Sequence, residues 1–280
     1  MSQFAKAQQL LSLHNNGKLL ILPNVWNPIG ARMLEAKGFP AVATASAAIA
    51  ESLGYSDGEQ IKLDTMLEMV ARIVRSVNVP VTADLEAGYS DTIEGLQENI
   101  GRLLDTGAAG INFEDSFDHG SRLRSIPKQV ERIKAIRQVA ERRGVHLVIN
   151  ARTDSFFADG FSSDEERLED AITRVNAYYK AGADCVYPIG RGDKETLAVL
   201  RKRVNAPINV LATAKTASLK ELQELGINRV SFGPYIFRSL LAKMSAMQDE
   251  IKDMCGYDIV MNGIWSGGDV KKYLVEGKEE

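Results

Sequence analysis

Acidic side chains stand at the ends of short apolar runs that are typical of buried parallel strands. Asp84 and Glu86 close the run 79–86, and Glu114 lies near the end of the run 109–115. Carboxylates that share one site repel each other unless a cation neutralises them. Because these are oxygen ligands without His or Cys, we expect a hard divalent ion, Mg²⁺ first and Mn²⁺ as the alternative.

An arginine lies in the next run of this kind along the chain. Arg152 belongs to HLVINARTD, residues 146–154. Its planar guanidinium is suited to forked contacts with a carboxylate or a phosphate, which makes it a candidate for contact with the substrate. The plainer alternative is an ion pair between Arg152 and Asp84 or Glu114.

Four other polar residues give weaker signals. Asp57 lies in the glycine-containing loop SLGYSDGEQ, where a solvated turn is the plain alternative to a catalytic role. His119 is either a lid residue or a surface histidine, and we expect the segment 115–125 around it to form a lid that is mobile without ligand. Asp115 and Asp154 also suit the N-cap of a helix.

A regular alternation of strands and helices positions these residues. Eight β-rich apolar runs alternate with segments whose apolar residues recur about every 3.6 positions. The runs are 19–24, 41–46, 79–86, 109–115, 146–154, 185–190, 208–212 and 229–234. The pattern predicts an α/β fold, a (β/α)₈ TIM-type barrel with its active site at the carboxyl ends of the strands. An open doubly wound sheet is the alternative, but its usual GxGxxG turn is missing after the first run.

We expect a single domain over residues 1–280, because no linker or low-complexity stretch interrupts the chain. A leading helix occupies 1–18, the barrel 19–251, and a C-terminal helical extension 252–280. The barrel does not require the aromatic and glycine residues of this extension. The extension therefore either packs on a neighbouring subunit or frays.

The composition excludes several classes of partner. The chain has 280 residues with 34 basic and 37 acidic side chains, and its formal net charge is −3. Nucleic-acid binders usually carry a basic excess, so we expect no nucleic-acid partner. No apolar run approaches the roughly 20 residues of a membrane helix, the start lacks a signal-peptide pattern, and two cysteines form no disulfide framework. We therefore expect a cytoplasmic protein without a membrane partner.

At these residues the sequence resembles the isocitrate lyase/phosphoenolpyruvate mutase superfamily, in its phosphoenolpyruvate mutase-like or carboxyvinyl-carboxyphosphonate phosphorylmutase-like branch. The most specific matches are TASAAIAESLGYSDG, VPVTADLEAGYS, GINFEDS, INARTDSF and INVLA, in the order of the family. The resemblance implies a small 2-oxo or 2-hydroxy acid held on Mg²⁺. A bond next to its carbonyl carbon would be broken or made.

The resemblance also implies roles for single residues. Asp84, Glu86 and Glu114 would arrange the metal, partly through its water molecules. The substrate would be held by a second group of residues, namely Ser46, Ala47, Ala48, Asn112, Arg152 and Asn209. Asp57 would lie near the reacting carbon, and His119 on the gating loop. Breaking a bond beside a carbonyl leaves an enolate, whose oxygen a metal and an arginine would stabilise.

The chain departs from the known members of the superfamily at several positions. The loop DSFDHGSRLRSIPKQ lacks the KKCGH-like motif of the isocitrate and methylisocitrate lyases. Ile189 occupies the region where those lyases carry an acidic residue. The gating loop carries Ser116, His119, Ser121 and Arg122 instead of the Lys and Asn or Thr of the phosphonate enzymes, and Glu86 replaces an Asp.

Three hypotheses about function follow. The first is a Mg²⁺-dependent lyase that cleaves a C–C bond of a small 2-oxo or 2-hydroxy acid, as in oxaloacetate decarboxylation or cleavage of a substituted malate. The second is a C–P bond enzyme, a phosphoenolpyruvate phosphomutase or a phosphonopyruvate hydrolase, with Arg122, Arg124 and Arg152 at the phosphoryl group. The third is a non-catalytic binding protein on the same fold.

A homo-oligomer, a dimer or tetramer, is the expected assembly. The resemblance implies an exchange of the last helix between subunits, which the apolar stretch IFRSLLAKMSAMQ allows. The same stretch also suits a helix that packs on its own barrel.

Overall fold

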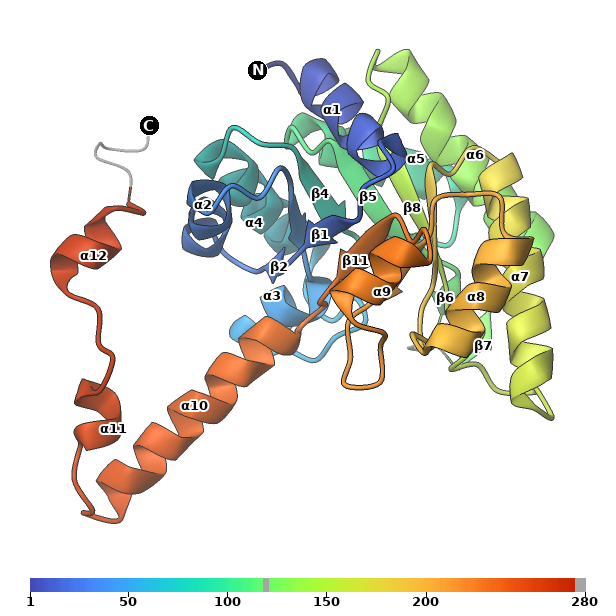
Figure 1. Cartoon of the computed structure of the whole chain (residues 1–280). Coiled ribbons are helices and arrows are strands. Elements are labelled where there is room, and N and C mark those ends of the chain that lie inside the picture. Colours follow the sequence, from blue (N-terminus) through green and yellow to red (C-terminus); the bar gives the residue numbers. More distant parts are fainter. Residues whose placement is uncertain (118–120, 275–280) are drawn as a thin grey trace.

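The computed structural model describes residues 1–117 and 121–274 and contains the predicted barrel (Figure 1). Its strands are β1 (Leu20–Leu22), β2 (Asn24–Val25), β3 (Val42–Thr44), β4 (Val81–Asp84), β5 (Gly110–Glu114), β8 (Val148–Thr153), β9 (Cys185–Pro188), β10 (Asn209–Leu211) and β11 (Arg229–Ser231). They pair in parallel in two groups, β2-β3-β4-β5-β8-β9 and β1-β11-β10. Each of the eight predicted runs contains a strand, and the fold prediction is confirmed.

The two groups of strands join into a closed barrel at two seams. At one seam β1 and β2 are a single extended segment interrupted at Pro23, which has no amide hydrogen for a strand ladder. Asn24 secures this seam, since its Oδ1 accepts hydrogen bonds from the amides of Phe232 and Gly233 at 2.7 and 2.9 Å. At the other seam a parallel bridge joins Val186 to Ile208.

Helices cover the outside of the barrel (Figure 1). They are α1 (Gln3–Asn15), α2 (Pro28–Ala36), α3 (Ser46–Ser52), α4 (Leu63–Ser76), α5 (Ile93–Asp105), α6 (Ile126–Arg142), α7 (Asp164–Lys180), α8 (Lys194–Arg203) and α9 (Leu219–Glu224). Because side chains alternate along a strand, one set of residues packs under these helices and the other fills the barrel. On β5, for example, Ile111 and Phe113 belong to the main hydrophobic core, whereas Asn112 faces the barrel interior.

The C-terminal helix α10 (Tyr235–Lys252) leaves the barrel instead of packing along it (Figure 1). Phe237 is its only buried residue and lies 4.9 Å from Trp26, measured between ring centroids. The short helices α11 (Asp258–Met261) and α12 (Gly267–Lys271) follow. The projecting part thus begins near Tyr235, within the range predicted for the barrel. The single-domain division itself stays a prediction.

A small hairpin follows β5. It pairs β6 (Ser116–Phe117) with β7 (Arg122–Leu123) in antiparallel fashion, and it lies within the segment predicted as a lid. The mobility of that segment stays a prediction. In the part of the chain that the structure describes, no helix is both long and apolar enough to cross a membrane.

His14 on α1 is buried beneath the barrel and generates a pH prediction. Its Nδ1 lies 2.8 Å from the carbonyl oxygen of Leu10, and burial followed by the charge of Arg229 lowers its pKa to about 4. The unfolded chain therefore takes up a proton below pH 6.5 that the folded chain refuses until about pH 4.

We expect the free energy of unfolding to fall by about 2 kcal/mol more in the wild type than in His14→Gln between pH 7 and pH 5. Urea unfolding of both proteins at the two pH values measures this difference. Equal losses in the two proteins would exclude His14 as an acid-sensitive group.

Candidate active site

A cavity of about 220 Å³ opens at the carboxyl ends of the barrel strands. Seven residues predicted from the sequence line it, namely Ser46, Ala47, Asp57, Asp84, Asn112, Arg152 and Asn209. They come from β4, β5, β8 and β10, from the start of α3, and from the loop that follows α3. The topology of the barrel therefore brings together residues that are distant in the sequence.

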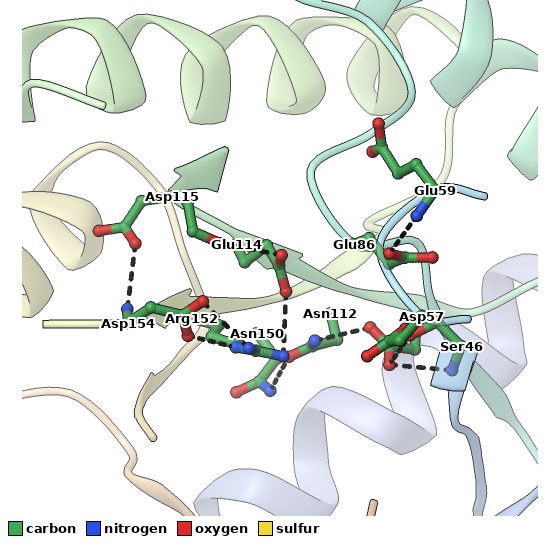
Figure 2. A network of polar contacts seen from close by, with 12 residues as sticks. Ser46, Asp57, Glu59, Glu86, Asn112, Glu114, Asp115, Asn150, Arg152 and Asp154 are labelled. Carbon is green, nitrogen blue, oxygen red and sulfur yellow. Dashed lines mark hydrogen bonds and ion pairs between the residues drawn. The ribbon is translucent and has the colours of Figure 1, made fainter. Parts of the chain in front are cut away.

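Asp84, the last residue of β4, contacts both Ser46 and Asn112, two members of the polar network in Figure 2. Its Oδ2 accepts hydrogen bonds from the amide of Ser46 at 3.1 Å and from the Ser46 hydroxyl at 2.8 Å. Its Oδ1 accepts one from Asn112 Nδ2 at 2.8 Å. Asn112 Oδ1 in turn accepts one from Asn150 Nδ2 at 2.8 Å. Neutral donors thus fix the Asp84 carboxylate on two sides.

Asp57 lies across the Ser46 hydroxyl from Asp84, and the Ser46 hydroxyl is 3.4 Å from Asp57 Oδ1. Burial, followed by the charge of Asp84, raises the pKa of Asp57 above its ordinary value. A carboxyl group in this condition can hold and release a proton closer to neutral pH. Asp57 lines the cavity from an exposed bend, and its catalytic role stays a prediction.

Glu86 is held in a strained but interlocked loop. Glu59, Glu86 and Tyr89 all have left-handed backbones, with φ values of 59°, 51° and 57°. Glu86 Oε2 accepts the amide of Glu59 at 2.7 Å, and Glu59 Oε1 accepts the amide of Tyr89 at 2.8 Å. Burial and the charges of Asp57, Asp84 and Glu114 raise the pKa of Glu86 to about 9.

Glu114, the last residue of β5, points toward the Arg152 guanidinium (Figure 2). Its Oε2 lies 3.0 Å from Arg152 Nη1, and its Oε1 accepts the Ser116 hydroxyl at 3.0 Å. Burial raises its pKa to about 8 although Arg152 opposes the shift. A second cation would be needed to ionise both Glu86 and Glu114 fully at neutral pH.

Arg152 is oriented by two carboxylates rather than one. Its Nε and Nη2 contact the two oxygens of Asp154 at 2.6 and 3.0 Å, which is a forked pair. Asp154 is fully buried, and its amide donates to Asp115 Oδ1 at 3.1 Å. Asp115 is anchored by the Tyr178 hydroxyl at 2.6 Å. The N-cap alternative for Asp115 and Asp154 is wrong, because Ser125 and Ser163 cap the helices that follow.

The donor chemistry suits a magnesium ion bound largely through water. Among the residues that the structure describes, no three His, Cys, Asp or Glu side chains lie close enough to hold an ion alone. The expectation that Asp84, Glu86 and Glu114 arrange the metal, partly through its water molecules, stays a prediction. Asp84 lines the cavity, whereas Glu86 and Glu114 are not part of its lining. An ion on Asp84 would reach the other two carboxylates through water, as Mg²⁺ commonly does.

Ala48, a further predicted residue, lies outside the cavity lining. It packs with Ala45 and Phe237 in a small apolar cluster. Its side chain thus supports the start of α3 from behind. His119 lies outside the described residues, and its role stays a prediction.

The cavity also contains polar residues that the sequence analysis did not single out. Asn24, Thr44, Arg229 and Arg238 all belong to its lining. Asn24, Thr44 and Arg229 occupy inward-facing strand positions. The alternation of side-chain direction along each strand could have predicted them from the sequence. Arg238 lies on α10, which was not expected to reach the active site.

Comparisons with known proteins agree with this architecture. The sequence profile of the phosphoenolpyruvate phosphomutase family matches residues 10–252. The chain belongs to this family, within the isocitrate lyase/phosphoenolpyruvate mutase superfamily. Members of the superfamily are lyases or mutases, and the chain is an enzyme of that group.

Three relatives illustrate the range of activities. A crystal structure from Burkholderia cenocepacia, with the provisional name phosphonomutase, is 37% identical, with a TM-score of 0.83 over 89% of this chain and 99% of that one. The 2-methylisocitrate lyase of Aeropyrum pernix is 30% identical over 84% of this chain and 76% of its own. Oxaloacetate decarboxylase 2 of Pseudomonas putida is 28% identical over 67% and 61%.

Asp154 generates a stability prediction for this family member. Asp154→Asn keeps the size of the side chain but leaves the buried Arg152 guanidinium with one carboxylate instead of two. Breaking a buried ion pair typically costs about 3 kcal/mol or more. We expect a loss of this size in the free energy of unfolding, measured by urea unfolding at pH 7.

The matched control is Asp64→Asn. Asp64 pairs with Arg102 at the surface, where its side chain is 78% exposed, so a loss below about 1 kcal/mol is expected. Similar losses in the two variants would show that Asp154 does not hold Arg152 in place.

Proposed function

We propose that this enzyme is a Mg²⁺-dependent lyase that cleaves a C–C bond of a small 2-oxo or 2-hydroxy acid through an enolate-like intermediate. The observation that carries the proposal is one cavity that presents Asp84, Ser46, Asn112 and the oriented guanidinium of Arg152 together. Oxaloacetate decarboxylation and cleavage of a substituted malate both fit this description.

The metal, when bound, supplies positive charge to the oxygen that becomes an enolate. The Ser46 hydroxyl, which already bonds Asp84, is placed to position the acid at the same point. Arg152, fixed by Glu114 and Asp154, offers a second positive charge whose orientation needs no rearrangement during the reaction. Asp57, with its raised pKa, is the group that would exchange a proton with the carbon.

The main alternative is a C–P bond enzyme. The 37% sequence identity to the Burkholderia protein with the provisional name phosphonomutase supports this alternative. The expected trio of arginines does not assemble around the cavity. Arg124 bonds Asp91 at 2.6 Å and stacks on Phe117, and Arg122 stacks on the same ring. Of the three, Arg152 alone belongs to the cavity lining. A ³¹P assay with phosphonopyruvate distinguishes the two chemistries.

The proposal is tested with oxalate, a mimic of pyruvate enolate. We expect oxalate to raise the melting temperature only when Mg²⁺ is present, because the ligand needs the ion. At 100 times its dissociation constant, the ligand adds about 2.7 kcal/mol to the free energy of unfolding. Thermal unfolding with each component alone and with both measures this coupling.

Asp84→Asn should abolish the oxalate shift, whereas the surface variant Asp64→Asn should keep it. Arg152→Lys should weaken it, because Lys cannot make a forked contact. If oxalate does not stabilise the wild type even with Mg²⁺, the lyase proposal fails and a binding protein without this chemistry becomes the better hypothesis.

We further propose that the enzyme forms a homo-oligomer through α10. One stripe of this helix carries Ile236, Leu240, Met244 and Ile251, which are 37 to 54% exposed. Exposed apolar stripes of this kind usually face a partner surface.

Light scattering after gel filtration should therefore give a mass that is a multiple of 30.7 kDa. The double variant Leu240→Glu with Met244→Glu should reduce it to one chain, whereas Lys243→Glu on the same helix should not. A monomeric wild type would contradict this assembly.

A further inference from the structure

An arginine at the base of the cavity has no counter-ion among the residues that the structure describes. Arg229 is the first residue of β11, and its side chain is 2% exposed. Val230, its neighbour in the strand, packs in the hydrophobic cluster under the helices. Arg229 therefore faces the barrel interior, where it lines the same cavity as Asp84 and Arg152.

The guanidinium of Arg229 is poorly satisfied within the protein. Its Nε and Nη1 are buried without a hydrogen-bond partner. Burial lowers its pKa below the ordinary value for an arginine. Burying an unpaired cation costs several kcal/mol, so the residue does not serve the stability of the barrel.

The other arginines of the cavity lining differ from Arg229 in this respect. Arg152 pairs with Glu114 and Asp154, and Arg238 pairs with Glu51. Within residues 1–117 and 121–274, no ion pair involves Arg229. An anionic group that enters the cavity therefore finds one cation whose charge no protein carboxylate has already matched.

We propose that Arg229 binds the second anionic group of the substrate, a carboxylate or a phosphonate, at the end remote from the 2-oxo or 2-hydroxy acid. This inference rests on the proposed function and deepens it, because it defines the substrate as a dianion. Asn209, the register partner of Arg229, and Ser231, two residues further along β11, supply further polar groups and form a hydrogen bond with each other at 3.2 Å.

The end of β9 offers no cation to a second anionic group of the substrate. Ile189 occupies that position and offers no hydrogen bond, while Tyr187 below it is neutral. Recognition would come from β11, two strands further along the barrel wall, through a charge-assisted hydrogen bond in a site that excludes most water.

The test compares two acids of equal length by titration calorimetry. Malate carries a carboxylate where 2-hydroxybutyrate carries a methyl group. We expect the wild type to bind malate at least about 10-fold more tightly. Arg229→Met should bind the two acids equally, whereas Arg238→Met should keep the preference for malate.

A second arm compares phosphonopyruvate with 2-oxobutyrate in the same proteins. A larger Arg229-dependent preference for malate identifies the second group as a carboxylate. A larger preference for phosphonopyruvate identifies it as a phosphonate. If the wild type shows no preference in either pair, or if Arg229→Met retains one, the assignment of Arg229 is wrong.

Oxalate separates this inference from the proposed function. Oxalate has no second end, so its Mg²⁺-dependent binding should be unchanged in Arg229→Met. If oxalate does not bind the wild type, the lyase proposal is contradicted. The preference for malate over 2-hydroxybutyrate, measured with Mg²⁺ and again with EDTA, still tests Arg229 in that case.

The melting temperature tells a binding residue from a structural one. Since Arg229 is unpaired, Arg229→Met should melt no lower than the wild type, and a large loss would mark the residue as structural. Should Arg229→Met fail to fold, Arg229→Gln, which keeps a polar amide in the barrel, gives the same comparison of ligands.

Discussion

The crowding of carboxylates at the mouth of the barrel is the constraint on which the rest of the site depends. Asp57, Asp84, Glu86 and Glu114 act on one another's charge although their exposure ranges from exposed to buried, and the pKa values of Asp57, Glu86 and Glu114 are raised. Three features reduce this repulsion. Neutral donors surround Asp84, and Arg152 lies beside Glu114. In the loop, the Glu59 amide donates a hydrogen bond to the Glu86 carboxylate. A site that is costly to build without a cation is well suited to capture one.

The barrel itself supplies the precision that this arrangement needs. Strand alternation sends apolar side chains outward under the helices and polar side chains inward, so the interior of this barrel is a network of amides, hydroxyls and arginines. The orientation of Arg152 depends on residues beyond those that contact it. Its orientation depends on Asp154, then on Asp115, and then on Tyr178 of α7, which lies outside the strands.

Much of this could be predicted from the sequence because strands and their polar ends follow simple periodic rules. The eight strands, and Asp84, Asn112 and Arg152 at one cavity, follow from apolar runs that end in charged residues. Asp154 was harder, since an acidic residue before a helix is as typical of a cap as of a buried pair. Arg229 was hidden because it begins its strand, at the end where stability rather than chemistry is expected. The path of α10 depends on contacts that local patterns do not encode.

The base of α10 joins two parts of the molecule that have different purposes. Pro234, Tyr235 and Arg238 line the cavity, and Phe237 packs on Trp26 and Ala48 behind the start of α3. The same helix then runs away from the barrel (Figure 1). A substitution at the base of α10 would therefore change the wall of the cavity and the packing behind α3 together.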